Sequence, residues 1–231
     1  MDGKKILKFL ISFLIIIQVL SFVFKIDLLN AISKITLSIS IPIFYCIRTA
    51  KIKIYHLSVI MLFAMGDLIV LTNFKNTIRY DMVIHIVGYV LLFYFLYYNH
   101  RSFEYNSRDV FTLVLGSLLY TVIFVLTYTV LRTPMGDMNI LGFLLLLLLY
   151  VLLIVAAMHY INTRSEKSLW FFLAILNFAF SDFMLLLNAF YVQSYELQVL
   201  MLLCTPMAWI FLVNYMITKP LKLKAEEFDA Y

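Results

Sequence analysis

Long apolar stretches constrain the fold of this chain more than any other feature of its sequence. Hydrophobic residues make up 64% of the 231 residues and charged residues only 13%, about half of the charged share in soluble domains. Apolar runs of about 20 residues cross a bilayer as helices, whereas membrane β-strands alternate apolar and polar residues. The six successive leucines at 144–149 show no such alternation. The sequence therefore predicts an all-α membrane protein, a transmembrane helix bundle forming a single domain over residues 1–231. Eight spans are expected, at about residues 5–24, 29–49, 54–73, 80–98, 109–132, 138–161, 168–191 and 195–218.

The distribution of basic residues predicts the orientation of these spans. With eight spans, both termini and every second loop lie on the same side of the membrane. Of the 18 Lys and Arg residues, only Lys25, Lys75, Arg79 and Arg132 fall in the opposite loops, and Lys34 lies near the start of a span. Because basic loops stay in the cytoplasm, both termini are expected to be cytoplasmic, in a multi-pass protein of a bacterial inner membrane. This orientation explains the net charge of +5, which gives no reason to expect a nucleic-acid partner.

Two aspartates lie deep inside apolar spans, in closely matching surroundings. Segments 63–73 and 178–188 have Phe, Ala, Asp, Leu and Asn at the same places. Asp182 follows Asp67 by 115 residues (182 − 67), almost half of the chain, so a 4+4 parallel internal repeat is expected. A carboxylate in hydrocarbon costs at least ~2.5 kcal/mol, and such residues are by default functional.

The matched positions of Asp67 and Asp182 predict a shared site. If their spans face each other, the two carboxyl groups lie at nearly equal depth, in the outer half of the membrane, and share one cavity. Two acids in a low-dielectric pocket resist being ionised together, so one can serve as a general acid and the other as a general base. The alternative is that each carboxyl only satisfies helix backbone or a polar neighbour and has a packing role.

Other polar residues within the spans are candidates for ligand binding. Asn73 and Asn188 follow the two aspartates by six residues and are placed to orient a polar head group, or simply to close a helix end at the interface. His85 and Tyr89 are four residues apart and share a helix face, where an interhelical hydrogen bond is the alternative to a functional role. The candidate substrate-binding residues are Asn73, His85, Tyr89, Asn177, Ser181 and Asn188.

The sequence has no pattern typical of a metal or cofactor site. It contains no His-x-x-x-His, no Glu-x-x-His, no Gly-x-Ser-x-Gly and no Walker loop, and only six glycines. Cys46 and Cys204 both fall within predicted spans, where packing residues are expected rather than a disulfide or a metal pair. We therefore expect no cofactor and no metal.

Three short segments carry a resemblance to a known family. Residues 66–71 read GDLIVL, residues 88–93 read GYVLLF, and residues 180–190 read FSDFMLLLNAF. These segments resemble the two signatures of the YhhN family, the lysoplasmalogenase family of integral membrane proteins, and the eight-span plan agrees. The resemblance implies a membrane hydrolase that cleaves the vinyl ether bond of a lysophospholipid, the lysoplasmalogen, to a fatty aldehyde and a glycerophospho-base. It also implies that Asp67 and Asp182 are the catalytic residues.

Two positions depart from the pattern of that family. The family usually has a His where this chain has Tyr89, and a Lys where it has Ile41, just before Pro42. His85, one turn from Tyr89, and Lys34, on the same span as Ile41, are the residues placed to replace them. These departures keep open a divergent member with an altered substrate and a non-catalytic lipid-binding protein of the same family. A proton-coupled transporter is the third hypothesis, because paired acids also suit ion relays.

Overall fold

The structure is a computed structural model that describes residues 3–49, 51–71, 77–98 and 106–218. Within these ranges the chain forms α-helices, one short 3-10 helix and no strand, so the all-α prediction is confirmed. The helices are α1 (Gly3–Val23), α2 (Asp27–Arg48), α3 (Ile54–Ile69), α4 (Thr77–Tyr98), α5 (Ser107–Leu131), η1 (Gly136–Met138), α6 (Asn139–Thr163), α7 (Glu166–Phe190) and α8 (Tyr195–Ile217). Each predicted span coincides with one α-helix. The largest difference is at span 54–73, because α3 ends at Ile69 and residues 72–76 lie outside the described ranges.

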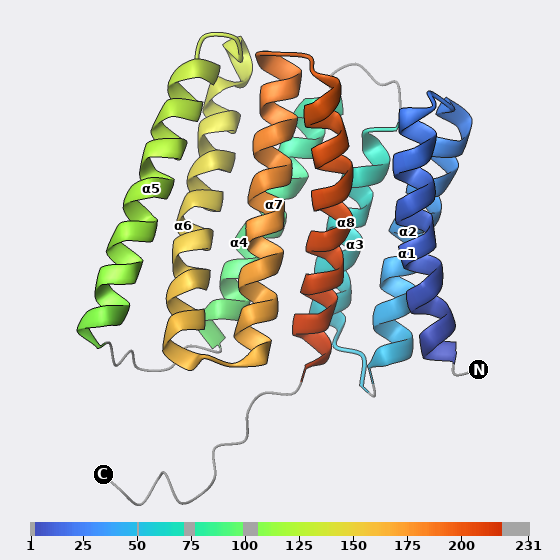
Figure 1. Cartoon of the computed structure of the whole chain (residues 1–231), viewed down its shortest axis with the longest axis horizontal. Coiled ribbons are helices and arrows are strands. Elements are labelled where there is room, and N and C mark those ends of the chain that lie inside the picture. Colours follow the sequence, from blue (N-terminus) through green and yellow to red (C-terminus); the bar gives the residue numbers. More distant parts are fainter. Residues whose placement is uncertain (1–2, 50, 72–76, 99–105, 219–231) are drawn as a thin grey trace, which may run out of the picture.

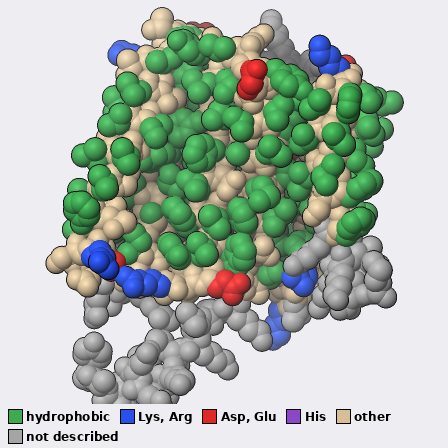
Figure 2. All heavy atoms as spheres, in the orientation of Figure 1, with side chains coloured by type: hydrophobic (Ala, Val, Ile, Leu, Met, Phe, Trp, Pro, Cys, Tyr) green, Lys and Arg blue, Asp and Glu red, His purple; other side chains and the backbone are tan. Residues whose placement is uncertain are grey.

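Six of the described helices are long and apolar enough to cross a membrane, as judged by length and composition. These six segments are Asp27–Arg48, Thr77–Leu96, Ser107–Leu131, Gly136–Thr163, Glu166–Phe190 and Tyr195–Ile217, and shorter apolar stretches occupy Phe9–Val23 and Ile54–Ile69. Figure 2 shows hydrophobic side chains over the middle of one face of the bundle, with charged side chains gathered toward its two ends. The fold is thus that of a multi-pass helical membrane protein.

The helices lie side by side along a common direction (Figure 1). α7 and α8 pack together in front of the pair α3 and α4, while α5–α6 and α1–α2 flank this centre on opposite sides. The start of α1 and the end of α8 are at the same end of the bundle. The centre is therefore built from the third and fourth helices of each half of the chain.

The helix packing of the first half recurs in the second half. α2 packs on α3 and α3 on α4, just as α6 packs on α7 and α7 on α8. Between the halves, α4 packs on α6 and, in the corresponding way, α8 packs on α2. At the centre, Phe63 of α3 stacks on Phe178 of α7 with ring centroids 5.0 Å apart. These two residues hold the same position in the matched segments 63–73 and 178–188.

Several local signals explain where the helices begin, end and weaken. Ser165 starts α7 with a capping box, in which it exchanges hydrogen bonds with Ser168 and satisfies donors that a helix start leaves free. Lys25, between α1 and α2, has a left-handed φ of 55°. Pro42 lies inside α2 and Pro206 inside α8. Because proline has no N–H, the carbonyl groups four residues earlier lose their helical partner.

Candidate functional site

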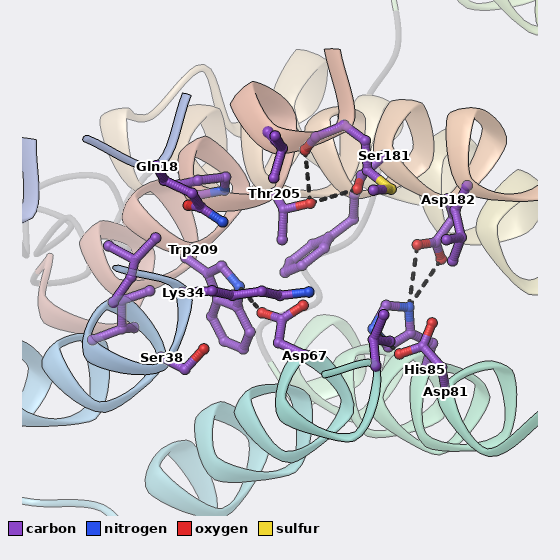
Figure 3. A pocket seen from close by; sticks show the side chains of 18 residues that line it. Gln18, Lys34, Ser38, Asp67, Asp81, His85, Ser181, Asp182, Thr205 and Trp209 are labelled. Carbon is purple, nitrogen blue, oxygen red and sulfur yellow. Dashed lines mark hydrogen bonds and ion pairs between the residues drawn. The ribbon is translucent and has the colours of Figure 1, made fainter. Parts of the chain in front are cut away.

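A cavity of about 60 Å³ lies in the centre of the bundle, lined by residues of α1, α2, α3, α4, α7 and α8 (Figure 3). It occupies the half of the bundle that is farther from the start of α1 and the end of α8. Since a water molecule needs at least ~10–15 Å³ by this measure, the cavity has room for a few waters or a small polar group. Both Asp67 and Asp182 line it, so the two matched aspartates meet at one site.

Asp182 is held by two residues of α4. The Tyr89 hydroxyl donates to Asp182 Oδ2 at 2.6 Å, and His85 Nδ1 lies 3.1 Å from Oδ1 and 3.3 Å from Oδ2. Asp182 is 1% exposed and Tyr89 is fully buried. Both carboxyl oxygens therefore belong to a buried network, in which Oδ2 accepts from Tyr89 and the direction of the contact with His85 depends on the tautomer of its ring.

Asp81 joins this network from the other side of His85. Its Oδ1 lies 3.6 Å from His85 Nε2, and the residue is only 3% exposed. A histidine flanked by two carboxylates can donate from both ring nitrogens when it is protonated. Asp81, His85 and Asp182 thus form a continuous acidic cluster along the cavity wall. Asp81 was not among the residues predicted from the sequence, although its position four residues before His85 puts both on one helix face.

Asp67 has a different environment from Asp182. It is partly exposed to the cavity, and its Oδ2 accepts one hydrogen bond, at 3.1 Å, from the indole N–H of Trp209 on α8. The preceding Gly66 allows α4 to approach closely, because a Cβ there would lie 3.3 Å from Asp81 Oδ1 and 3.2 Å from Ile84 Cγ2. This close approach brings Asp81 beside the helix that carries Asp67.

The two aspartates are held crosswise between the halves of the chain. Asp67, on the third helix of the first half, bonds to Trp209 on the last helix of the second half. Asp182, on the third helix of the second half, bonds to Tyr89 on the last helix of the first half. Asp67 and Asp182 thus each accept a hydrogen bond from a residue of the other half.

A second polar group lies at the α1–α2 side of the cavity. Gln18, Lys34 and Ser38 line this wall (Figure 3), with Lys34 extended toward Asp67. Gln18 is 3% exposed, and its Oε1 is buried without a hydrogen-bond partner. Ile41 lines the same cavity, so Lys34 and Ile41 lie on the same wall.

The remaining predicted residues have varied positions. Ser181 lines the cavity and shares a 2.6 Å hydrogen bond with Thr205 of α8. Asn177 donates to the Leu173 carbonyl of its own helix at 2.8 Å. Asn188 closes the α7–α8 turn, where it accepts from the Ser194 backbone N–H and from the Gln198 side chain.

Asn73 lies outside the described residues. Among the described residues, no group of three or more His, Cys, Asp or Glu side chains is arranged to hold a metal ion.

Comparisons with known proteins identify no relative: no family model, no curated protein and no solved structure matches this chain. The interpretation of the site therefore depends on its own chemistry. The cavity combines three carboxyl groups, an imidazole and an ammonium group within the membrane-spanning part of an apolar bundle. Such a set can donate a proton, accept a proton and stabilise a developing positive charge.

Proposed function

We propose that this protein is a membrane hydrolase of the lysoplasmalogenase type, a divergent relative of the YhhN family. Its substrate would be a lysoplasmalogen, whose vinyl ether bond is cleaved to a fatty aldehyde and a glycerophospho-base. The observation that carries the proposal is the meeting of Asp67 and Asp182 in one cavity with unequal partners. Unequal partners are what an acid and a base need, because the two groups must differ in protonation when the substrate arrives.

The hydrogen-bond pattern favours one assignment of the two roles. Asp182 accepts from Tyr89 on Oδ2, and both of its oxygens lie within hydrogen-bond distance of His85 Nδ1, an environment that suits the carboxylate. Among the described residues, Asp67 accepts a hydrogen bond on Oδ2 alone, and Oδ1 would carry a proton toward the cavity. Asp67 would therefore be the general acid, and Asp182 the carboxylate that stabilises the cation and activates water.

The two carboxyl groups and one water molecule account for every proton transfer in the reaction. Asp67 gives its proton to the β-carbon of the vinyl ether, and the resulting oxocarbenium ion is stabilised by the Asp182 carboxylate. Water adds to the α-carbon and releases a proton to Asp182, which forms a hemiacetal. The hemiacetal hydroxyl then returns a proton to Asp67 while Asp182 protonates the departing glycerol oxygen. The aldehyde and the alcohol leave, and both carboxyl groups are back in their starting states.

The proposed topology has eight membrane crossings and both termini in the cytoplasm of a bacterium. Shorter apolar stretches at Phe9–Val23 and Ile54–Ile69 would complete the two crossings beyond the six long helices. Because the cavity lies away from the start of α1 and the end of α8, it would sit in the outer half of the inner membrane. Reporter fusions to each loop test this arrangement, and a cytoplasmic signal from the α1–α2 turn would contradict it.

An aldehyde-release assay tests the activity directly. The purified protein, in lipid nanodiscs, is given a lysoplasmalogen and, as a control, an ordinary lysophospholipid. We expect aldehyde only from the first, and a loss of about 100-fold or more for Asp67→Asn and for Asp182→Asn. Asp109→Asn is the matched control. Asp109 lies in α5, outside the cavity, and pairs with Arg164 at the end of α6. Full activity of both Asp→Asn variants, or no aldehyde from the wild-type protein, would refute the proposal.

The cluster Asp81–His85–Asp182 favours one second candidate, a proton-coupled carrier. Carboxyl groups joined through a histidine in a membrane form a proton relay, and His85 lies 3.6 Å from Asp81 and 3.1 Å from Asp182. A carrier would acidify or alkalinise proteoliposomes when its substrate moves. Aldehyde release without such pH changes distinguishes the hydrolase from the carrier.

A further inference from the structure

We propose that the cavity wall formed by Gln18, Lys34 and Ser38 binds the glycerophosphate part of a lysophospholipid. Lys34 would bind the phosphate, and Gln18 would accept a hydrogen bond from the free glycerol hydroxyl. This inference rests on the proposed function for the identity of the lipid, and it goes further by naming the residues that recognise the lyso form.

The strongest evidence is the unpartnered oxygen of Gln18. The side chain is 3% exposed and lines the cavity, yet its Oε1 has no hydrogen bond to any residue that the structure describes. A buried polar atom without a partner is unfavourable and needs an explanation. Lys34 and Ser38 line the same wall without donating to this oxygen. A bound molecule with a hydroxyl group would supply the missing donor.

Lys34 supplies the charge that a phosphate needs. It lies on α2 one turn before Ser38, so the ammonium and the hydroxyl are on the same helix face and both reach the cavity. An ammonium group has donors only, and an anionic oxygen is its natural ligand. Because the surrounding helices are long and apolar, a lipid phosphate is favoured over a soluble anion.

The groups of a lysoplasmalogen follow one another along its glycerol backbone. The free hydroxyl lies on the glycerol carbon between the phosphate-bearing carbon and the carbon that bears the vinyl ether. In Figure 3, Gln18 and Ser38 lie on one side, the Lys34 side chain crosses from that side to end beside Asp67, and Asp182 lies on the far side. A lysoplasmalogen bound through Lys34 and Gln18 would thus have its vinyl ether in the cavity that both aspartates line.

Recognition of the hydroxyl would make the site selective for lysolipids. A lipid acylated at this hydroxyl has no donor for Gln18 and places a second chain beside this buried side chain. Sites built to bind a substrate hydroxyl reject analogues that lack it, because the polar group of the protein is left unpaired. Gln18 is thus proposed as a specificity-determining residue.

Binding of a non-hydrolysable lipid tests this subsite separately from turnover. The probe is a 1-alkyl lysophospholipid, which has a saturated ether in place of the vinyl ether, and its 2-deoxy analogue lacks the glycerol hydroxyl. Calorimetric titration of the nanodisc-embedded protein measures both affinities. We expect Lys34→Met to weaken binding of either lipid about tenfold or more. We also expect the wild-type protein to prefer the hydroxyl-bearing lipid and Gln18→Met to lose that preference.

Controls separate the possible outcomes of this experiment. Lys51→Met, an exposed lysine outside the cavity, should bind like the wild-type protein, and glycerol 3-phosphate without a chain should bind far more weakly than the lipid. Unchanged binding by Lys34→Met, a hydroxyl preference that survives in Gln18→Met, or equal binding of glycerol 3-phosphate would each overturn the inference. If the binding pattern holds but no aldehyde forms, the subsite stands and the hydrolase proposal fails. If aldehyde forms and the pattern is absent, the hydrolase stands and the subsite fails.

Discussion

Replacing Gly88 by alanine should strain the centre of the bundle. A Cβ at this position would lie 2.5, 2.8 and 2.9 Å from three ring atoms of Phe63, whereas carbon atoms pack at about 3.5–4.0 Å. The Phe63 ring is fully buried, and four other rings surround it with centroids at 5.0–5.5 Å. The ring has no space to retreat, so α3 and α4 must move apart.

The size of the effect follows from this overlap. Overpacking a dense core costs about 1–3 kcal/mol, and an overlap of roughly 1 Å against a fixed ring belongs at the upper end of that range. At about 2–4 °C per kcal/mol for a chain of this length, Gly88→Ala should lower the melting temperature by about 4–12 °C. Gly116→Ala is the matched control, because nothing lies within 4 Å of a Cβ there and alanine favours the helix by up to about 1 kcal/mol.

The melting temperature can be followed with a thiol-reactive fluorogenic dye. Cys46 and Cys204 are free and only partly exposed, so they react fully when the bundle opens. The double variant Gly88→Ala with Phe63→Leu should recover part of the loss, since the two positions are in contact. If Gly88→Ala melts no lower than Gly116→Ala, the claim that Phe63 is rigidly held is wrong.

Three further substitutions test separate parts of the structure. Tyr89→Phe removes the 2.6 Å donor to Asp182 and should lower aldehyde release about tenfold, measured as kcat; an unchanged kcat would show that this donor has no role in turnover. Ser165→Ala breaks the capping box of α7 and should destabilise the protein by about 1 kcal/mol, seen as a lower melting temperature that Ser165→Asp largely restores. Lys25→Gly removes a side chain from a left-handed residue with φ of 55° and should stabilise by about 1 kcal/mol, whereas Lys25→Ala should not; equal melting of the two variants would contradict this reasoning.

The helices were predictable from the sequence because a single property determines them. Each predicted span is a long run of mostly apolar residues, and each coincides with a helix of the structure, six of which are long and apolar enough to cross a membrane. The meeting of Asp67 and Asp182 was predictable for a related reason. Matched segments in the two halves imply matched depth, and the structure places both residues in one cavity.

The partners of the aspartates were harder to predict. Asp81 falls at the start of a predicted span, where an acidic residue is ordinarily at the interface, and its burial depends on the close approach that Gly66 allows. Trp209 and Gln18 lie on helices rich in apolar residues, so the sequence does not indicate which face turns toward the cavity. That information comes from how α1 and α8 pack around the centre, a long-range property that no local pattern contains.

The crosswise bonding of the aspartates also has a consequence for how the protein is made. Asp67 and its donor Trp209 are 142 residues apart, so α3 is synthesised long before α8. Until then Asp67 lacks the indole that holds it in the finished protein, and a lone carboxyl in hydrocarbon is costly. A chain that stops before α8 would therefore leave Asp67 without its hydrogen bond from Trp209. Synthesis of α8 would therefore both complete the cavity and supply the hydrogen-bond donor of Asp67.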